Sequence, residues 1–420
     1  MKVLIKNIKQ IVGIAQNSTQ EIKKGTDLNI LNTLNDGWIL IEDGIIIDFG
    51  NMQNWIGIDD WNHTKIIDAN QGIVMPTFCD SHTHIVYSGS REKEFVDRIK
   101  GLTYEEIAKN GGGILNSAKT LANTSENDLY NQSAQRLDQL IRLGTGAIEI
   151  KSGYGLNTEN EIKMLRVIKR LQDNYPILIK STFLGAHAIP EGISQEKYVE
   201  LIINEMIPEV AKQNLANYID VFCDRGFFTP RETEKILQAG IKHGLKPKLH
   251  ANELDYSGGI EVGVKMNAIS VDHLEYTNKT HIELLKNSNT IPTLLPGTAY
   301  FLGLKYPPAR LMIDSGLPIA IASDFNPGSC PTGNMSLVMS LSCIKMNLTP
   351  NEALNAVTIN GAFAMEIEKS HGQIKKGAKA NLIITKKIPS LEYIPYSMGE
   401  NVIEKVIING KVYHDSETNH

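Results

Sequence analysis

Two histidines separated by a single residue, His82 and His84, could provide two ligands for one metal ion. They end an apolar run that begins at Val74 and predicts a buried strand. Side chains two residues apart on a strand point to the same side, so both imidazoles would meet where the strand ends. Imidazoles on a rigid backbone are common metal ligands, although this pattern alone also fits two ordinary surface or core histidines.

Other apolar runs of the chain also end in residues that could bind a metal. If these runs are parallel strands of one barrel, their ends face the same mouth. Three imidazoles and a carboxylate suit Zn²⁺, or iron in a mononuclear site. Each histidine alone, including His187 at the end of another run, is more often an ordinary core or surface residue. Their joint occurrence favours a metal site, and the residues concerned are His82, His84, His250, His273 and Asp324.

Further polar residues could act on a substrate or could simply be structural. Glu253 lies in the loop after His250, where it could be an acid or base, although glutamates are common in surface loops. Lys151 ends another apolar run and could bridge two metals if carbamylated, a role that a single-metal site does not need. Tyr104 and Tyr154 could close a pocket or could only pack.

A turn and an arginine could together bind a carboxylate. Asn326, Gly328 and Ser329 form a predicted turn before a helical stretch that begins near Thr332, where backbone N–H groups favour an anion. Ordinary turn chemistry explains the same residues. Arg91 could hold a carboxylate through two hydrogen bonds, or it could be a solvated surface arginine.

The central part of the chain repeats one pattern that would position these residues. An apolar, β-branched run ends in a polar residue, and a helix-like stretch follows. The repeat predicts an α/β fold, a (β/α)8 TIM-like barrel with its chemistry at the C-terminal strand ends, while a doubly wound open sheet is the alternative. After the opening run, the predicted strands cover 146–151, 177–187, 219–224, 246–250, 268–273, 290–296 and 317–324, and the helix-like stretches include 159–173, 196–212, 229–243, 257–266 and 279–286.

Both ends of the chain have a different pattern of short strands and turns. Residues 38–50 form two apolar runs around an Asp-Gly pair, and residues 402–413 contain an Asn-Gly pair, both of which are hairpin signals. We therefore predict a small β-sandwich domain from residues 1–72 and 371–420, and a hydrolase barrel from residues 73–370.

One connection is too long for an ordinary barrel unit. Between Gly89 and Thr145 a helix is predicted to begin at Thr103 with a pattern similar to a capping box, and Gly111–Gly113 precede a second helical stretch that ends near Leu143. The glycines lack the lysine of a phosphate-binding loop and follow a helix. We interpret them as a flexible bend in a segment over the barrel mouth, which could act as a lid.

Composition limits the possible partners of the chain. The formal net charge is −5, so no basic excess suggests nucleic acid or an anionic membrane surface. The four cysteines, Cys79, Cys223, Cys330 and Cys343, show no CxxC pairing and predict no disulfide framework. Neither a signal peptide nor a membrane span is predicted, which favours a cytoplasmic protein. An exposed barrel flank could form a homodimer.

The motifs resemble those of the metal-dependent amidohydrolase superfamily and, within it, the imidazolonepropionase family. The HxH pair with two later histidines and an aspartate carries only the broader resemblance. The closer resemblance runs over nearly the whole chain, and it rests on Asp80–His84, Arg91, Tyr104–Ala108, Gly111–Ile114, Glu149–Gly155, Thr182–His187, Leu249–Glu253, Asp272–Tyr276, Leu295–Gly297 and Asp324–Gly328.

The resemblance implies hydrolysis of 4-imidazolone-5-propanoate to N-formimidoyl-L-glutamate, in the degradation of histidine to glutamate. It implies one Zn²⁺ or Fe³⁺ ion per subunit, bound by His82, His84, His250 and Asp324. It implies catalytic roles for His273, Asp324 and Glu253, although other members have Gln at the position of Glu253. The substrate contacts that it implies are Arg91, Tyr154, His187, Glu253, Asn326, Gly328 and Ser329.

Two other functions would fit part of this pattern. A deaminase of a cytosine-like or guanine-like base would share the ligand set and the glutamate, but it would have less need for Arg91 and the turn at Asn326–Ser329. A non-catalytic scaffold of the same fold would be expected to have lost ligands, whereas the full set is present here.

Overall fold

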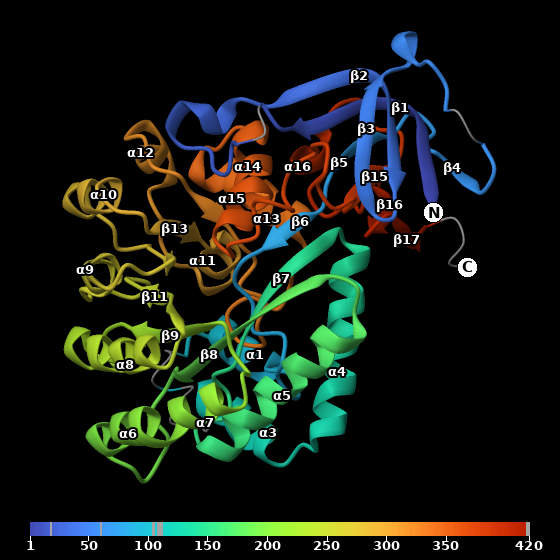
Figure 1. The fold of residues 1–420 in the computed structure, drawn as a ribbon. Helices are drawn as coiled ribbons and strands as arrows, with labels where there is room; N and C mark the ends of the chain where they lie inside the picture. Colours follow the sequence, from blue (N-terminus) through green and yellow to red (C-terminus); the bar gives the residue numbers. More distant parts are fainter. Residues whose placement is uncertain (17–18, 59–60, 103–105, 107–111, 417–420) are drawn as a thin grey trace.

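The computed structural model describes residues 1–16, 19–58, 61–102, 106 and 112–416, and contains a parallel barrel and a mixed terminal sheet (Figure 1). The barrel strands follow the order β14-β13-β12-β11-β9-β8-β7-β6, and every neighbouring pair is parallel. This arrangement confirms the predicted barrel rather than the open sheet. The strands are β6 (Phe78–Asp80), β7 (Thr145–Lys151), β8 (Leu178–Ala186), β9 (Tyr218–Cys223), β11 (Leu249–Ala251), β12 (Ser270–His273), β13 (Ile291–Leu294) and β14 (Ala320–Ile321), and β10 (Lys246–Pro247) pairs with β9 beside them.

The first and last barrel strands meet just beyond their C-terminal ends. Thr83 forms a parallel bridge with Phe325. The N–H of Asp324 donates to the carbonyl of His82 at 2.9 Å, and the N–H of His84 donates to that of Phe325, also at 2.9 Å. The seam of the barrel therefore joins the segment of His82 and His84 directly to the segment of Asp324.

Helices on the outside of the barrel agree closely with the sequence pattern. α5 (Thr158–Asn174), α8 (Pro230–Lys242), α9 (Gly259–Lys265) and α10 (Lys279–Lys286) lie where helix-like stretches were predicted. The stretch at 196–212 is divided into α6 (Gln195–Leu201), a π-helical turn at Ile202–Met206 and α7 (Ile207–Lys212). Pro208 lies just after this turn and has no N–H to continue the regular α-helical bonding.

Among the remaining helices, α4 packs against α5 and β7 of the barrel and against β16 and β17 of the terminal sheet (Figure 1). No helix in the described part of the chain is long and apolar enough to cross a membrane. These helices are α1 (Glu92–Ile99), α3 (Gly113–Ala122), α4 (Glu126–Arg142), α11 (Pro296–Leu302), α12 (Ala309–Asp314), α13 (Met335–Met346), α14 (Pro350–Val357), α15 (Ile359–Phe363) and α16 (Tyr393–Tyr396), with 3-10 turns at Gly25–Asn29 and Met52–Asn54.

Strands from both termini form the mixed sheet in the order β17-β16-β15-β5-β1-β2-β3, with β4 beside β1. Both predicted hairpin turns are present, because Asp43-Gly44 and Asn409-Gly410 have positive φ at both positions. A separate apolar core lies against this sheet. Its strands are β1 (Lys2–Ile14), β2 (Asn32–Glu42), β3 (Ile45–Asn51), β4 (Thr64–Asp68), β5 (Ile73–Pro76), β15 (Leu382–Thr385), β16 (Ile403–Ile408) and β17 (Lys411–Asp415).

The apolar run before His82 is divided between the two sheets, so the prediction of one continuous strand is wrong. β5 pairs with β1 and β15 in the terminal sheet, whereas β6 pairs with β7 in the barrel. Both parts are apolar because both are buried on two sides. The proposed boundaries of 1–72 with 371–420, and of 73–370, stay predictions.

Part of the long connection after β6 lies outside the described residues. This applies to the helix predicted to begin at Thr103, to Tyr104 and to Gly111, so the interpretation of the glycines as a lid stays a prediction. The second helical stretch of the connection is present as α3 and α4.

Candidate metal centre

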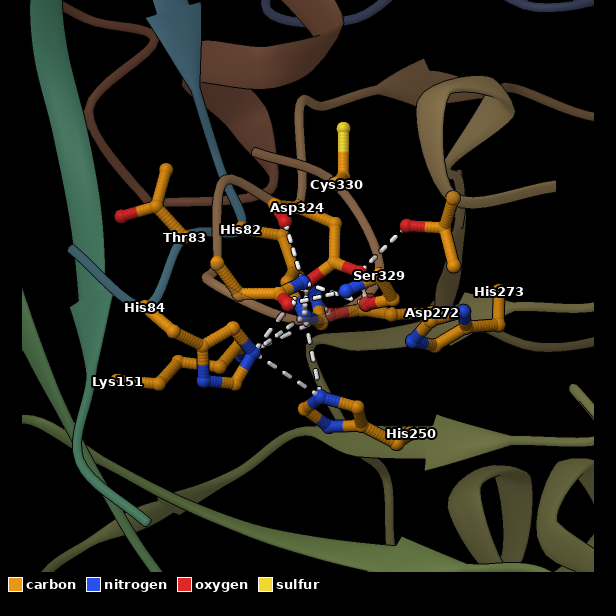
Figure 2. Close-up of polar contacts among 12 residues, drawn as sticks. His82, Thr83, His84, Lys151, His250, Asp272, His273, Asp324, Ser329 and Cys330 are labelled. Carbon is orange, nitrogen blue, oxygen red and sulfur yellow. Dashed lines mark hydrogen bonds and ion pairs between the residues drawn. The ribbon is translucent and has the colours of Figure 1, made fainter. Parts of the chain in front are cut away.

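Three buried imidazoles converge at the C-terminal mouth of the barrel (Figure 2). His82 and His84 follow β6, and His250 lies within β11. The Nε2 atom of His82 lies 3.2 Å from Nε2 of His84 and 3.1 Å from Nε2 of His250. The Nε2 atoms of His84 and His250 are 3.4 Å apart. Three ring nitrogens thus form a compact triangle.

Asp324 adds an oxygen atom to this triangle. Its Oδ1 lies 3.4 Å from Nε2 of both His82 and His84. The other oxygen, Oδ2, accepts a hydrogen bond from the hydroxyl of Thr298 at 2.5 Å. Asp324 has a φ of +54°, so the chain turns sharply after β14 at this carboxylate.

The donor atoms fit a single divalent metal ion. In a tetrahedral site with bonds of about 2.0 Å, neighbouring ligand atoms lie about 3.3 Å apart. The five separations given above for the three Nε2 atoms and the carboxylate oxygen run from 3.1 to 3.4 Å. Three nitrogens and one oxygen are also a common donor set for such ions. His82, His84, His250 and Asp324 could therefore hold one metal ion.

Two buried aspartates orient two of these imidazoles. Oδ2 of Asp272 lies 2.6 Å from Nδ1 of His82, and Oδ2 of Asp220 lies 3.0 Å from Nδ1 of His250. Each Nδ1–H donates to a carboxylate, which leaves the Nε2 lone pair facing the shared centre. The sequence interpretation missed both aspartates, although an acidic residue inside an apolar strand is a usable signal.

A buried lysine holds those aspartates in turn. Nζ of Lys151 lies 2.8 Å from Asp220, 3.6 Å from Asp272 and 2.6 Å from Glu149. Burial alone would lower the pKa of Lys151, but the carboxylates of Asp220 and Glu149 raise it above its ordinary value. Glu149 also pairs with the buried Lys248. A carbamate requires an uncharged amine, so this environment does not favour Lys151 as a metal bridge.

His273 and Glu253 lie beside the triangle rather than in it. The ring centroid of His273 lies 5.6 Å from that of His82 and 5.2 Å from that of His250. Its Nδ1 is 3.7 Å from Oε2 of Glu253. Burial alone would lower the pKa of His273, but the carboxylates of Glu253 and Glu275 raise it to about 9. The two carboxylates therefore favour the protonated form of His273, which can donate hydrogen bonds.

His187 and Tyr154 lie on the side of His84. The His187 ring is stacked on that of His84, with centroids 5.3 Å apart and planes 13° apart. The Tyr154 ring lies 5.4 Å from that of His187. Nδ1 of His187 donates to the carbonyl of Gly153 at 3.0 Å. Burial lowers the pKa of His187 to about 3, so the ring is neutral at pH 7.

Arg91 lies against the turn that contains Asn326, Gly328 and Ser329. A Cβ atom added to Gly328 would lie 2.0 Å from Nη1 of Arg91, so only glycine allows this close approach. Nε and Nη2 of Arg91 donate to Glu94 at 2.7 and 2.6 Å. The predicted arginine and the predicted turn therefore lie together.

One detail of that turn differs from the sequence prediction. The N–H groups of Gly328 and Ser329 both donate to Oδ1 of Asn326, at 2.8 Å each. Both N–H groups are therefore already hydrogen-bonded within the turn. The positive charge beside this turn is that of the Arg91 guanidinium. The following helix, α13, begins at Met335 rather than near Thr332.

Glu161 of α5 fixes the loop that carries Tyr154. Its Oε1 accepts hydrogen bonds from the N–H groups of Gly155 at 2.7 Å and Leu156 at 3.1 Å. Its Oε2 accepts from the N–H of Gly153 at 3.2 Å. Glu161 is fully buried, and nothing in the sequence distinguished it from other helical glutamates.

Comparisons with known proteins agree with this geometry. A profile of the Amidohydrolase family matches residues 73–413. The chain is 55% identical to the imidazolonepropionase of Flavobacterium johnsoniae, over 98% of this chain and 100% of that protein. It is 53% identical to that of Christiangramia forsetii, over 98% and 100% of the two chains. It is 43% identical to that of Geobacillus kaustophilus, over 98% and 97%.

Solved structures with lower identity share the architecture. A triazine hydrolase variant has a TM-score of 0.75 at 13% identity, covering 99% of this chain and 95% of that chain. A guanine deaminase from C. acetobutylicum has a TM-score of 0.69 at 18% identity, covering 98% and 100%. At these identities, the likeness shows the fold alone.

Proposed function

This chain belongs to the amidohydrolase family, and we propose that it hydrolyses 4-imidazolone-5-propanoate to N-formimidoyl-L-glutamate, in the degradation of histidine to glutamate. Full-length relatives with 53 to 55% identity are imidazolonepropionases, which supports this substrate. The observation that carries the proposal is the position of Arg91, a cation for a propionate, at the turn that follows Asp324. One site would thus combine hydrolytic chemistry with carboxylate binding.

The donor set supports one Zn²⁺ or Fe³⁺ ion held by His82, His84, His250 and Asp324. When bound there, the ion supplies a water molecule activated for attack at neutral pH. Asp272 and Asp220 keep the Nε2 atoms of His82 and His250 free for it by holding their Nδ1 protons. Metal analysis of the purified protein distinguishes zinc from iron.

Side chains of the site transfer protons and stabilise the charge that develops during the reaction. Asp324 takes a proton from the attacking water and delivers it to the ring nitrogen that leaves when the lactam opens. Thr298 donates to Oδ2 of Asp324 and so fixes the plane of that carboxylate. His273, as a cation, donates a hydrogen bond to the oxyanion that develops on the carbonyl oxygen. Glu253 lies beside His273, where it can orient the water or bind a ring proton.

Two groups of residues bind the substrate in this proposal. Arg91, which lies against the turn of Asn326, Gly328 and Ser329, holds the propionate. Tyr154 and neutral His187 lie next to His84. A planar imidazolone ring can lie against these two side chains.

Replacing Arg91 with lysine is expected to raise KM about 30-fold and to leave kcat within about threefold. Lysine keeps the positive charge, but it loses the forked geometry that binds both carboxylate oxygens. Steady-state kinetics with 4-imidazolone-5-propanoate measures both constants. Arg166→Lys, on the exposed side of α5, is the matched control, and an unchanged KM in Arg91→Lys would contradict the assignment.

Replacing Glu161 with glutamine is expected to raise KM about tenfold, with little change in kcat. The amide NH2 group would face a backbone N–H that now donates to a carboxylate, so the loop carrying Tyr154 would shift. The same kinetics, with the melting temperature of the variant, would measure this. Equal loss of kcat and kcat/KM with unchanged KM would contradict a role in substrate binding.

The decisive test is turnover of 4-imidazolone-5-propanoate by the metal-replete protein, compared with a panel of cytosine-like and guanine-like bases. Loss of the imidazolone absorbance together with formation of N-formimidoyl-L-glutamate is expected. Ammonia release from a free base without imidazolone turnover would instead support a deaminase. No turnover of any compound, and no metal after gentle purification, would support a non-catalytic scaffold.

A further inference from the structure

Glu275 is a buried carboxyl group to which the mechanism above gives no role. It follows β12 by two residues and is only 2% exposed. Among the described residues, neither Oε1 nor Oε2 has a hydrogen-bond partner. A buried carboxyl group without hydrogen bonds is unfavourable, so packing alone does not explain it.

The chain bends so that Glu275 faces His273. His273 and Leu274 have φ values of +84° and +72°, a left-handed conformation that is uncommon for these residues. Main-chain hydrogen bonds hold the bend on both sides of Glu275. The N–H of Leu274 donates to Ala251 at 3.1 Å, and that of Tyr276 donates to Asn252 at 2.8 Å.

This bend brings Glu275 to the Nδ1 side of the His273 ring. Oε1 of Glu275 lies 4.0 Å from Nδ1 of His273, and Oε2 of Glu253 lies 3.7 Å from the same nitrogen. Nδ1 has no hydrogen-bond partner among the described residues. Two carboxyl groups therefore face this nitrogen, while the ring as a whole lies next to His82 and His250 (Figure 2).

Other charged groups near Glu275 do not neutralise it. The carboxylates of Glu253 and Asp324 both oppose its ionisation, whereas the cation of His273 favours it. Lys305 interacts electrostatically with Glu275, but Nζ of Lys305 lies 3.2 Å from the centre of the Tyr276 ring. Burial is the largest cause of the raised pKa of Glu275.

We propose that Glu275 is a positioning residue for the hydrolysis, which acts through His273 by facing Nδ1 together with Glu253 and so keeps the imidazole turned toward the reacting carbonyl. The inference rests on the proposed function, because the orientation of His273 matters only if that ring donates to the substrate. In the described part of the chain, no hydrogen bond or ion pair joins Glu275 to the four candidate ligands or to a residue assigned to the propionate. Substitution of Glu275 should therefore change kcat, and this change should depend on the presence of His273.

A double-mutant cycle tests this dependence. Glu275→Gln, which keeps the shape of the side chain, is expected to lower kcat about 10- to 100-fold and to leave KM within about threefold. In the His273→Ala background, the same substitution should change kcat less than about threefold. Glu283→Gln, on the exposed face of α10, is the matched control for loss of one carboxylate. Equal effects of Glu275→Gln with and without His273 would overturn the proposal.

A second measurement is independent of turnover and separates this proposal from the proposed function. In protein labelled with ¹⁵N-histidine, the ring signals of His273 are those lost in His273→Ala. At pH 7, Glu275→Gln is expected to move these signals and to leave the signal of His243 in place. Unmoved His273 signals would overturn the positioning role. If they move but the wild-type protein does not hydrolyse the imidazolone, the contact stands, and the proposed substrate and the role in hydrolysis both fail.

Discussion

Substitution of Asp324 with asparagine is expected to lower kcat about a thousandfold. Asparagine keeps the size of the side chain and an oxygen that can accept the hydrogen bond of Thr298. It cannot take a proton from the attacking water, because its amide oxygen is not basic at neutral pH. The loss should therefore appear in kcat measured on protein that metal analysis shows to contain one ion per chain.

The metal measurement is essential to this experiment, because Oδ1 of Asp324 also lies beside the histidine triangle. Variants at His250 would remove a donor atom and are expected to lose the metal itself. Asp173→Asn, at an exposed position of α5, is the control for the loss of one negative charge. A metal-replete Asp324→Asn protein within about tenfold of wild-type kcat would mean that another group, such as Glu253, takes the proton.

The fold could be predicted largely because most barrel strands are short apolar runs that end in or lead to a polar residue. Apolar residues recur about every 3.6 positions in the helices between the strands. Both hairpin turns contain an Asp-Gly or Asn-Gly pair, which such turns favour. The division between β5 and β6 could not be predicted, because no charged residue or glycine interrupts the sequence between Val74 and Cys79. It depends on pairing of β5 with β15, about 300 residues later in the chain.

Part of the candidate site could likewise be predicted from the sequence, and part could not. His82, His84, His250 and Asp324 lie at strand ends, and the barrel brings them together as predicted, although their role as ligands stays a proposal. Asp220 and Asp272 lie inside strands, and their partners follow only from the three-dimensional neighbours of those strands. Glu275 was missed for a different reason, because the left-handed bend before it has no glycine or asparagine to signal it.

The confirmed family assignment bears on the proposed roles of the residues in the candidate site. The resemblance to imidazolonepropionases, first seen in short motifs, is confirmed by relatives with 53 to 55% identity over 98% of the chain. The shared architecture with a triazine hydrolase and a guanine deaminase shows how little the barrel alone determines the substrate. In the proposed function, discrimination between substrates comes from side chains around the donor atoms, including Arg91, Tyr154 and His187.

Substitution of His273 with alanine is expected to lower kcat about 100- to 1,000-fold while metal content stays at one ion per chain. The metal should be retained, because the three imidazoles that form the compact group are His82, His84 and His250. The activity should fall, because removal of a cationic donor leaves the developing oxyanion less stabilised. Steady-state kinetics and metal analysis on the same preparation measure both quantities.

Two comparison variants separate the loss of a hydrogen bond from the loss of packing at this position. His273→Gln keeps an N–H donor without the positive charge, and is expected to recover at least tenfold in kcat over the alanine variant. His243→Ala, at the exposed end of α8, removes an imidazole to which the mechanism gives no role and should have wild-type kinetics. Near-normal turnover by metal-replete His273→Ala would remove His273 from the mechanism, and with it the reason for Glu275 to face its ring.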